Sequence, residues 1–122
     1  MRELKMKSNQ SPILTIDVAH PPLPADQVEA LLIESWSRVR NSENLRVLKF
    51  VHGYGSSGKG GSTRELVRNW AFHHRSKFRN VIEGEVYHLL NPAVQEMRRE
   101  LETFTDADLQ HPNEGITILW VK

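Results

Sequence analysis

The sequence predicts an α/β fold: a two-layer sandwich of helices on a four-stranded sheet that is mainly parallel or mixed. Short apolar or β-branched runs alternate with amphipathic segments of helical length, in the order strand, helix, strand, helix, strand, helix, strand. The chain has 122 residues, of which 39% are hydrophobic and 25% charged, as is ordinary for one globular domain. It has no cysteine, which excludes disulfides, a thiol nucleophile and cysteine-based metal sites.

A single domain is expected over residues 13–122, preceded by a flexible tail over residues 1–12, which lack apolar periodicity. All apolar runs are much shorter than the ~20 residues of a membrane-spanning helix. No apolar stretch follows the charged N-terminus, as it would in a secretory signal. We therefore expect a cytoplasmic protein that has no membrane partner and is a monomer.

A strand, a helix and a second strand are predicted first. Residues 13–18 (ILTIDV) are rich in β-branched side chains, and the prolines that follow cannot donate to a strand ladder. The helix is expected to begin near Pro24 to Asp26 and to end at Asn41 and Ser42, and residues 47–51 (VLKFV) predict the second strand. The apolar face of this helix consists of Val28, Leu31, Leu32, Trp36 and Val39.

Two further helices and two strands follow. Residues 62–65 (STRE) have the pattern of a capping box and predict a helix that runs to about Arg75. Residues 78–82 predict a weaker strand, and Asn91-Pro92 predicts the start of a third helix. The apolar side of that helix consists of Ala93, Val94, Met97, Leu101 and Phe104. Residues 116–121 (ITILWV) are continuously apolar, which predicts a central strand.

The charge is distributed unevenly along the chain. Residues 38–79 hold 10 basic and 2 acidic side chains, a balance of +8. Residues 1–37 (3 basic, 5 acidic) and 80–122 (3 basic, 8 acidic) carry −2 and −5, which brings the total to +1. Two interpretations are open: the basic block binds phosphate or nucleic acid, or the blocks neutralise one another across the fold.

The segment 52–61 (HGYGSSGKGG) places five glycines between a strand and a helix N-terminus. Glycine lets the backbone approach a ligand closely, and a helix N-terminus offers unpaired N–H groups and partial positive charge. The predicted phosphate-binding residues are Gly53, Tyr54, Gly55, Gly58, Lys59 and Gly60, with Tyr54 as a candidate for base stacking. The alternative is a turn that binds nothing. Gly60 stands where a P-loop needs Ser or Thr, so no nucleotide cofactor is expected.

The motifs around this segment resemble those of the small MutS-related (Smr) domain. VLKFVHGYG at 47–55 resembles the family's H-G-x-G signature, IDVAH at 16–20 its L-D-L-H-G-like signature, and GITILWV at 115–121 its closing strand. The resemblance implies DNA or RNA as partner, an endonuclease activity that several members have, and a fold like the C-terminal domain of a bacterial translation initiation factor. The chain departs from the family at Ala19, where the family has His, and at His20, where it usually has Gly.

Asp17 and His52 are the candidate catalytic residues, each at the carboxyl end of a predicted strand. In open α/β sheets ligands bind at this edge, so both side chains are expected beside the glycine segment. Asp17 could serve as base or metal ligand, and His52 as acid, base or phosphate donor. The cofactor stays open, with magnesium or manganese as candidates, and no metal-ligand spacing is found. The alternatives are a non-catalytic nucleic-acid-binding module and a binder of small phosphate ligands.

Arg64 and Arg68 are four residues apart and share a helical face. They are predicted to contact nucleic acid, in a basic strip with Lys59, Arg75, Lys77 and Arg79. The alternative is a solvated face whose charge the acidic last third of the chain offsets.

Overall fold

The structure is a computed structural model that describes residues 11–54 and 59–122, and the side chains of residues 59–61 are outside this description. Of the predicted tail, only Ser11 and Pro12 are among the described residues. The Pro12 carbonyl accepts hydrogen bonds from the backbone N–H groups of Arg46 and Val47, at 2.8 and 3.0 Å. Pro12 is therefore part of the folded domain.

Four strands form one mixed sheet in the order β1-β2-β4-β3. The strands are β1 (Ile13–Asp17), β2 (Val47–Val51), β3 (Phe78–Glu83) and β4 (Ile116–Val121). β1 and β2 are parallel, as predicted, and β4 lies antiparallel between β2 and β3. The carboxyl ends of β1 and β2 therefore meet at the same edge as the beginning of β4.

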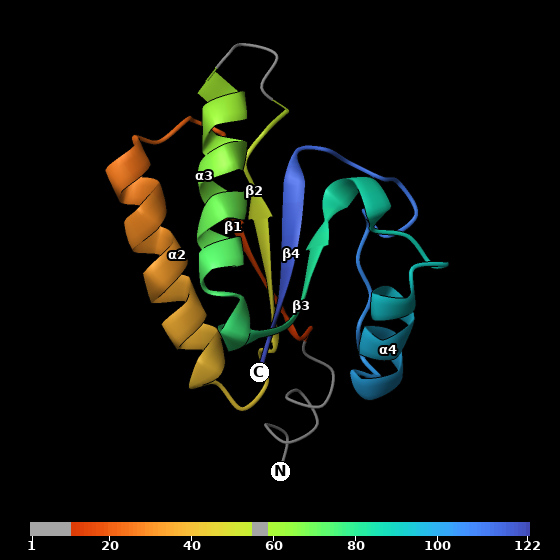
Figure 1. Ribbon diagram of the computed structural model, residues 1–122. Coiled ribbons are helices and arrows are strands. Elements are labelled where there is room, and N and C mark those ends of the chain that lie inside the picture. The colour runs from red at the N-terminus through yellow and green to blue at the C-terminus, as the bar shows by residue number, and fades with distance from the viewer. Residues whose placement is uncertain (1–10, 55–58) are drawn as a thin grey trace.

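Helices cover both faces of the sheet (Figure 1). α2 (Ala25–Arg40) and α3 (Lys59–His73) lie side by side on one face, and α4 (Pro92–Glu100) covers the other. Short 3-10 helices precede and follow β3: η1 (Arg75–Lys77) and η2 (Gly84–Val86). α4 thus adds a third layer, which the predicted two-layer sandwich lacks. No helix among the described residues is long and apolar enough to cross a membrane.

The core consists of two clusters separated by the sheet. Leu48, Phe50 and Leu119 pack under α2 and α3, whereas Ile118 and Trp120 pack under α4. Because β4 has neighbours on both faces, all six of its residues are buried. The prediction that the continuous apolar run forms a central strand is confirmed.

Two predicted helix boundaries are wrong. α3 begins at Lys59, so the STRE segment lies within the helix instead of capping it. Ser, Thr and Glu also occur inside helices, and the cap pattern alone does not fix the first residue. α4 ends at Glu100, before Leu101 and Phe104, although a turn still brings Phe104 into the core. The predicted start of α4 is confirmed, because the Asn91 side chain accepts a hydrogen bond from the Ala93 N–H group at 2.8 Å.

Candidate functional site at the carboxyl edge of the sheet

The predicted site residues lie near the carboxyl ends of β1 and β2. The N–H groups of His52 and Gly53 both donate to the Gly115 carbonyl, at 2.8 and 3.0 Å, which joins the end of β2 to the start of β4. Gly53 has a φ of 90°, which side chains rarely tolerate. Gly55 and Gly58 lie outside the described residues. Lys59 and Gly60 form the beginning of α3, and the position of the Lys59 side chain is likewise outside the description.

The Asp17 carboxylate is engaged in a turn of its own chain. Its Oδ1 accepts hydrogen bonds from the N–H groups of Ala19 and His20, at 2.8 and 3.0 Å, and its Oδ2 lies 2.9 Å from His20 Nδ1. Burial alone would raise the pKa of this carboxyl, but these hydrogen bonds outweigh burial and hold the pKa below its usual value. These contacts favour the ionised form of Asp17, and its hydrogen bonds fix the turn that follows β1.

Asp17 and His52 lie on opposite faces of the sheet. Asp17 is in register with Val51, which packs on the α4 side. His52 follows Val51, so it points to the other side, where its ring contacts Thr117 under α3. The predicted convergence of the two side chains is absent because they are one residue out of register.

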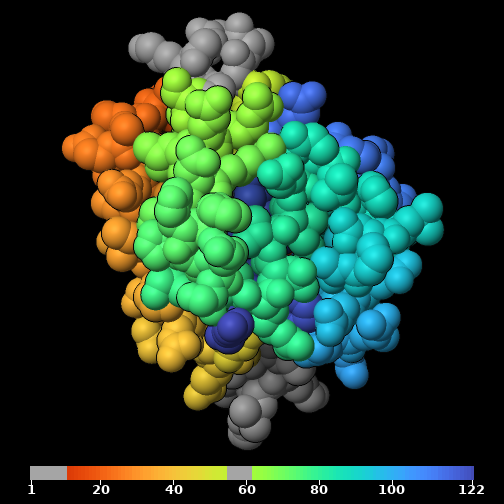
Figure 2. All heavy atoms as spheres, in the orientation of Figure 1, coloured from red at the N-terminus to blue at the C-terminus, as the bar shows by residue number. Residues whose placement is uncertain are grey.

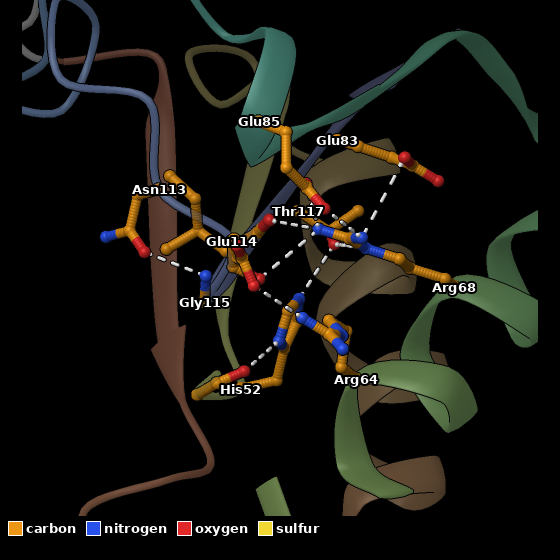
Figure 3. Close-up of polar contacts among 11 residues, drawn as sticks. His52, Arg64, Arg68, Glu83, Glu85, Asn113, Glu114, Gly115 and Thr117 are labelled. Atoms are coloured by element: carbon orange, nitrogen blue, oxygen red, sulfur yellow. Dashed lines mark hydrogen bonds and ion pairs between the residues drawn. The ribbon is translucent and has the colours of Figure 1, made fainter. Parts of the chain in front are cut away.

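His52 is fully buried and both ring nitrogens have partners (Figure 3). Nδ1 lies 3.1 Å from the Gly53 carbonyl, which only accepts, so Nδ1 carries the proton. Nε2 lies 2.8 Å from Thr117 Oγ1. Arg68 Nε donates to the same hydroxyl at 3.0 Å, so the Thr117 hydroxyl accepts from Arg68 and donates to His52.

This environment keeps His52 neutral. Burial is the largest influence and lowers its pKa to about 4, and the positive charges of Arg68 and Arg64 act in the same direction. The hydrogen bond to Gly53 opposes this shift but does not overcome it. His52 thus holds the Gly53 backbone, and neither nitrogen is free to act on a ligand.

Arg68 is also occupied within the protein. Its Nη1 and Nη2 form a bidentate pair with Glu85, at 3.0 and 2.7 Å, and Nη2 also donates to the Ile116 carbonyl at 3.1 Å. With the bond from Nε to Thr117, all three guanidinium nitrogens have partners. The hydrogen bond from Arg68 lowers the pKa of Glu85. Arg68 therefore joins α3, η2 and β4, and the structure does not offer its guanidinium to a phosphate.

Tyr54 is the most exposed described side chain of the predicted set, and Arg64 is 28% exposed. Arg64 Nη1 lies 3.2 Å from Glu114 Oε1, and the Glu114 side chain is 59% exposed, so this pair contributes little and opens readily. Tyr54 directly follows Gly53 and is 56% exposed. Tyr54 and Arg64 can reach a ligand at this edge.

Thr117 and Glu85 were not predicted, although they complete the cluster. Thr117 is the one hydroxyl in the apolar run 116–121, and a buried hydroxyl needs a partner. That signal could have pointed to a buried polar network. Glu85 carries no comparable signal, because its partner Arg68 is 17 residues away.

A metal-dependent site does not fit the described residues. They contain no group of three or more His, Asp or Glu side chains placed to hold a metal ion. Both Asp17 oxygens have hydrogen-bond partners within its own turn, and both His52 ring nitrogens have partners. We therefore derive no step that uses magnesium or manganese.

The chain was compared with known proteins at three levels. No protein-family model, curated protein or solved structure matches it.

Proposed function

We propose that the protein is a nucleic-acid-binding module that does not use Asp17 and His52 to cleave its ligand. The proposal rests on which basic side chains of residues 38–79 form ion pairs in the fold. Four of its members form ion pairs with acidic residues of the last third of the chain: Lys49, Arg64, Arg68 and Arg79. Five others form no ion pair with a described acidic side chain, although Arg46 and Arg75 donate to backbone carbonyls and Lys77 lies over the Trp36 ring: Arg38, Arg40, Arg46, Arg75 and Lys77.

Unpaired basic charge is what binding to a polyanion requires. Neutralising phosphates releases counterions, and this release supplies much of the affinity of proteins for nucleic acids. The fold neutralises some charges of the basic block, as the second interpretation expects, and leaves others without an ion pair among the described residues, which supports the first. The similarity of residues 16–20 and 47–55 to the Smr signatures supports the same class of ligand.

The geometry favours binding over cleavage. General acid–base cleavage of a phosphodiester needs a base and an acid that reach the same phosphate. Asp17 and His52 are on opposite faces, and His52 is buried and fully hydrogen-bonded. Ala19, at the position of the family's His, removes a third candidate.

Two assays on one preparation test the proposal. Fluorescence anisotropy with labelled DNA and RNA oligonucleotides should show binding that weakens steeply between about 50 and 200 mM salt. Plasmid DNA and structured RNA, incubated with magnesium or manganese, should stay intact. Cleavage that the Asp17→Asn variant abolishes would contradict the proposal and favour an endonuclease. The absence of binding at low salt would contradict it as well.

A further inference from the structure

The five unpaired basic side chains gather at one end of the molecule, which we call the basic end: Arg38, Arg40, Arg46, Arg75 and Lys77. Arg38 and Arg40 are in the last turn of α2, and Arg75 and Lys77 are in η1, directly after α3. These segments and the C-terminus meet at the end of the molecule opposite the beginning of α3 (Figures 1 and 2).

Three contacts join the segments of the basic end. Lys77 Nζ lies 4.2 Å from the centroid of the Trp36 ring, which joins η1 to α2. Arg40 is one helical turn beyond Trp36, on the same side of α2. Arg46 Nη1 donates to the Val39 carbonyl at 3.2 Å, and the Lys122 N–H group donates to the Lys77 carbonyl at 3.1 Å. Glu43, in the exposed turn after α2, is the acidic side chain nearest in the sequence to Arg40.

An exposed aromatic ring adjoins these cations. The Phe72 side chain is 60% exposed, and the Arg75 guanidinium carbon lies 4.3 Å from its ring centroid. The same residues line an open groove of about 400 Å³ between α3 and β3, whose other wall includes Val81. The hollow between the two elements is visible in Figure 2. A ring in this position can stack on a nucleic-acid base while neighbouring cations contact phosphates.

We propose that the basic end is a binding surface for single-stranded nucleic acid. The inference rests on the proposed function and deepens it by naming the surface and the form of the ligand. The cations that form no ion pair contact the phosphates, and Phe72 stacks on a base. Only an unpaired base offers its face to such a ring, because the faces of duplex bases are already stacked. The contact surface is therefore the end of the molecule opposite Gly53 and the beginning of α3.

The charge contribution is tested with two variants that remove the same charge. Arg38→Gln/Arg40→Gln changes the last turn of α2, and the control Arg98→Gln/Arg99→Gln changes the last turn of α4, on the other face of the sheet. Both lose two exposed arginines and the same favourable interaction with a helix C-terminus. Two lost contacts to a single strand should reduce the salt slope by about 1.4 and weaken binding at 0.1 M salt about 25-fold. The control should bind like the wild type.

The stacking contribution is tested with Phe72→Ala and Phe72→Tyr. The first removes the ring and should weaken binding of a labelled oligothymidylate about 5- to 140-fold. The second keeps the ring and should bind like the wild type. Binding of a duplex should not change in either variant. Because Phe72 is largely exposed, both variants should unfold at the same urea concentration as the wild type.

The outcomes separate this inference from the proposed function. If both double variants bind a single strand as well as the wild type, the basic end is not the contact surface, although the protein still binds nucleic acid. If Phe72→Ala weakens single-strand and duplex binding equally, the preference for a single strand is refuted. Competition by polyglutamate as strong as by the oligonucleotide would overturn the assignment in favour of an acidic protein partner. A wild-type protein that binds no nucleic acid refutes the proposed function itself.

Discussion

His52 is kept neutral mainly by burial, and its two hydrogen bonds have directions that are fixed by their partners. The Gly53 carbonyl only accepts and the Arg68 guanidinium only donates, so the Thr117 hydroxyl between them has one possible orientation. This chain of donors and acceptors extends from α3 to the end of β2. The residue that resembles the family's signature histidine therefore fixes the backbone at Gly53.

The neutral state of His52 makes the stability of the protein depend on pH. In the unfolded chain its pKa is about 6.5, and in the folded protein it is about 4. Between these values the unfolded chain binds more protons, so the free energy of unfolding falls as the pH falls. We expect a loss of about 2 kcal/mol between pH 7 and pH 5, measured by urea unfolding. His52→Gln should remove most of this dependence, and an unchanged dependence would show that other groups cause it.

Arg64 and Arg68 are neighbours on α3 but should respond differently to truncation. Arg68→Ala leaves Glu85, Thr117 and the Ile116 carbonyl without a donor and should lower the free energy of unfolding by about 3 kcal/mol. Arg64→Ala breaks one exposed ion pair and should change it by less than about 1 kcal/mol. Urea denaturation of the two variants provides the measurement. Equal losses would contradict the structural role assigned to Arg68.

At the scale of the elements, β2 carries a buried cation on its α4 side. The Lys49 ammonium lies 2.9 Å from Asp106 Oδ1 and also pairs with Asp108, and the Tyr87 hydroxyl donates to Asp106 Oδ2 at 3.0 Å. Burial lowers the pKa of Lys49, but the hydrogen bonds to the two carboxylates outweigh burial and raise it overall. These contacts fasten the loop after α4 to the sheet.

Replacing Asp106 or Asp108 should show how much each carboxylate contributes to the free energy of unfolding. Asp106→Asn leaves the buried Lys49 with one anionic partner and should lower the free energy of unfolding by about 3 kcal/mol. Asp108 is 32% exposed, compared with 12% for Asp106, so Asp108→Asn should cost less, about 1 kcal/mol. Thermal or urea unfolding measures both. A larger loss for Asp108→Asn would mean that Asp108 is the main partner of Lys49.

The elements were largely predictable because hydrophobic periodicity reports local structure. The four strands, the parallel pairing of β1 with β2 and the central β4 follow from apolar runs and their order. The start of α3 was not predictable from the STRE pattern, which fits both a cap and a helix interior. The position of α4 on the opposite face depends on tertiary packing, which periodicity does not specify.

The candidate site was less predictable because it depends on strand register and long-range pairing. Asp17 and His52 both follow apolar runs, but a register of Asp17 with Val51 sends their side chains to opposite faces. The sequence left open whether Arg68 contacts nucleic acid or lies on a solvated face whose charge the acidic last third of the chain offsets, and in the structure it pairs with Glu85. That choice is made by the position of η2 beside α3, which no local pattern determines.

At the scale of the whole molecule, the fold sorts the basic block into two groups. Lys49, Arg64, Arg68 and Arg79 pair with the acidic last third of the chain, whereas the basic end keeps its charges. The overall charge of +1 therefore conceals a molecule with one strongly basic end. Such a concentration of positive charge attracts polyanions, and the rest of the chain carries a net charge of −4.

The salt dependence of single-strand binding tests the central claim most directly. The observed association constant of the wild type with an oligothymidylate is measured by anisotropy at several salt concentrations. If all five cations of the basic end contact phosphates, the slope of log K against log salt should be about −3.5, at ~0.7 per contact. A clearly negative slope that becomes shallower in Arg38→Gln/Arg40→Gln agrees with the account. A slope near zero, or no binding at the lowest salt concentration, would contradict it.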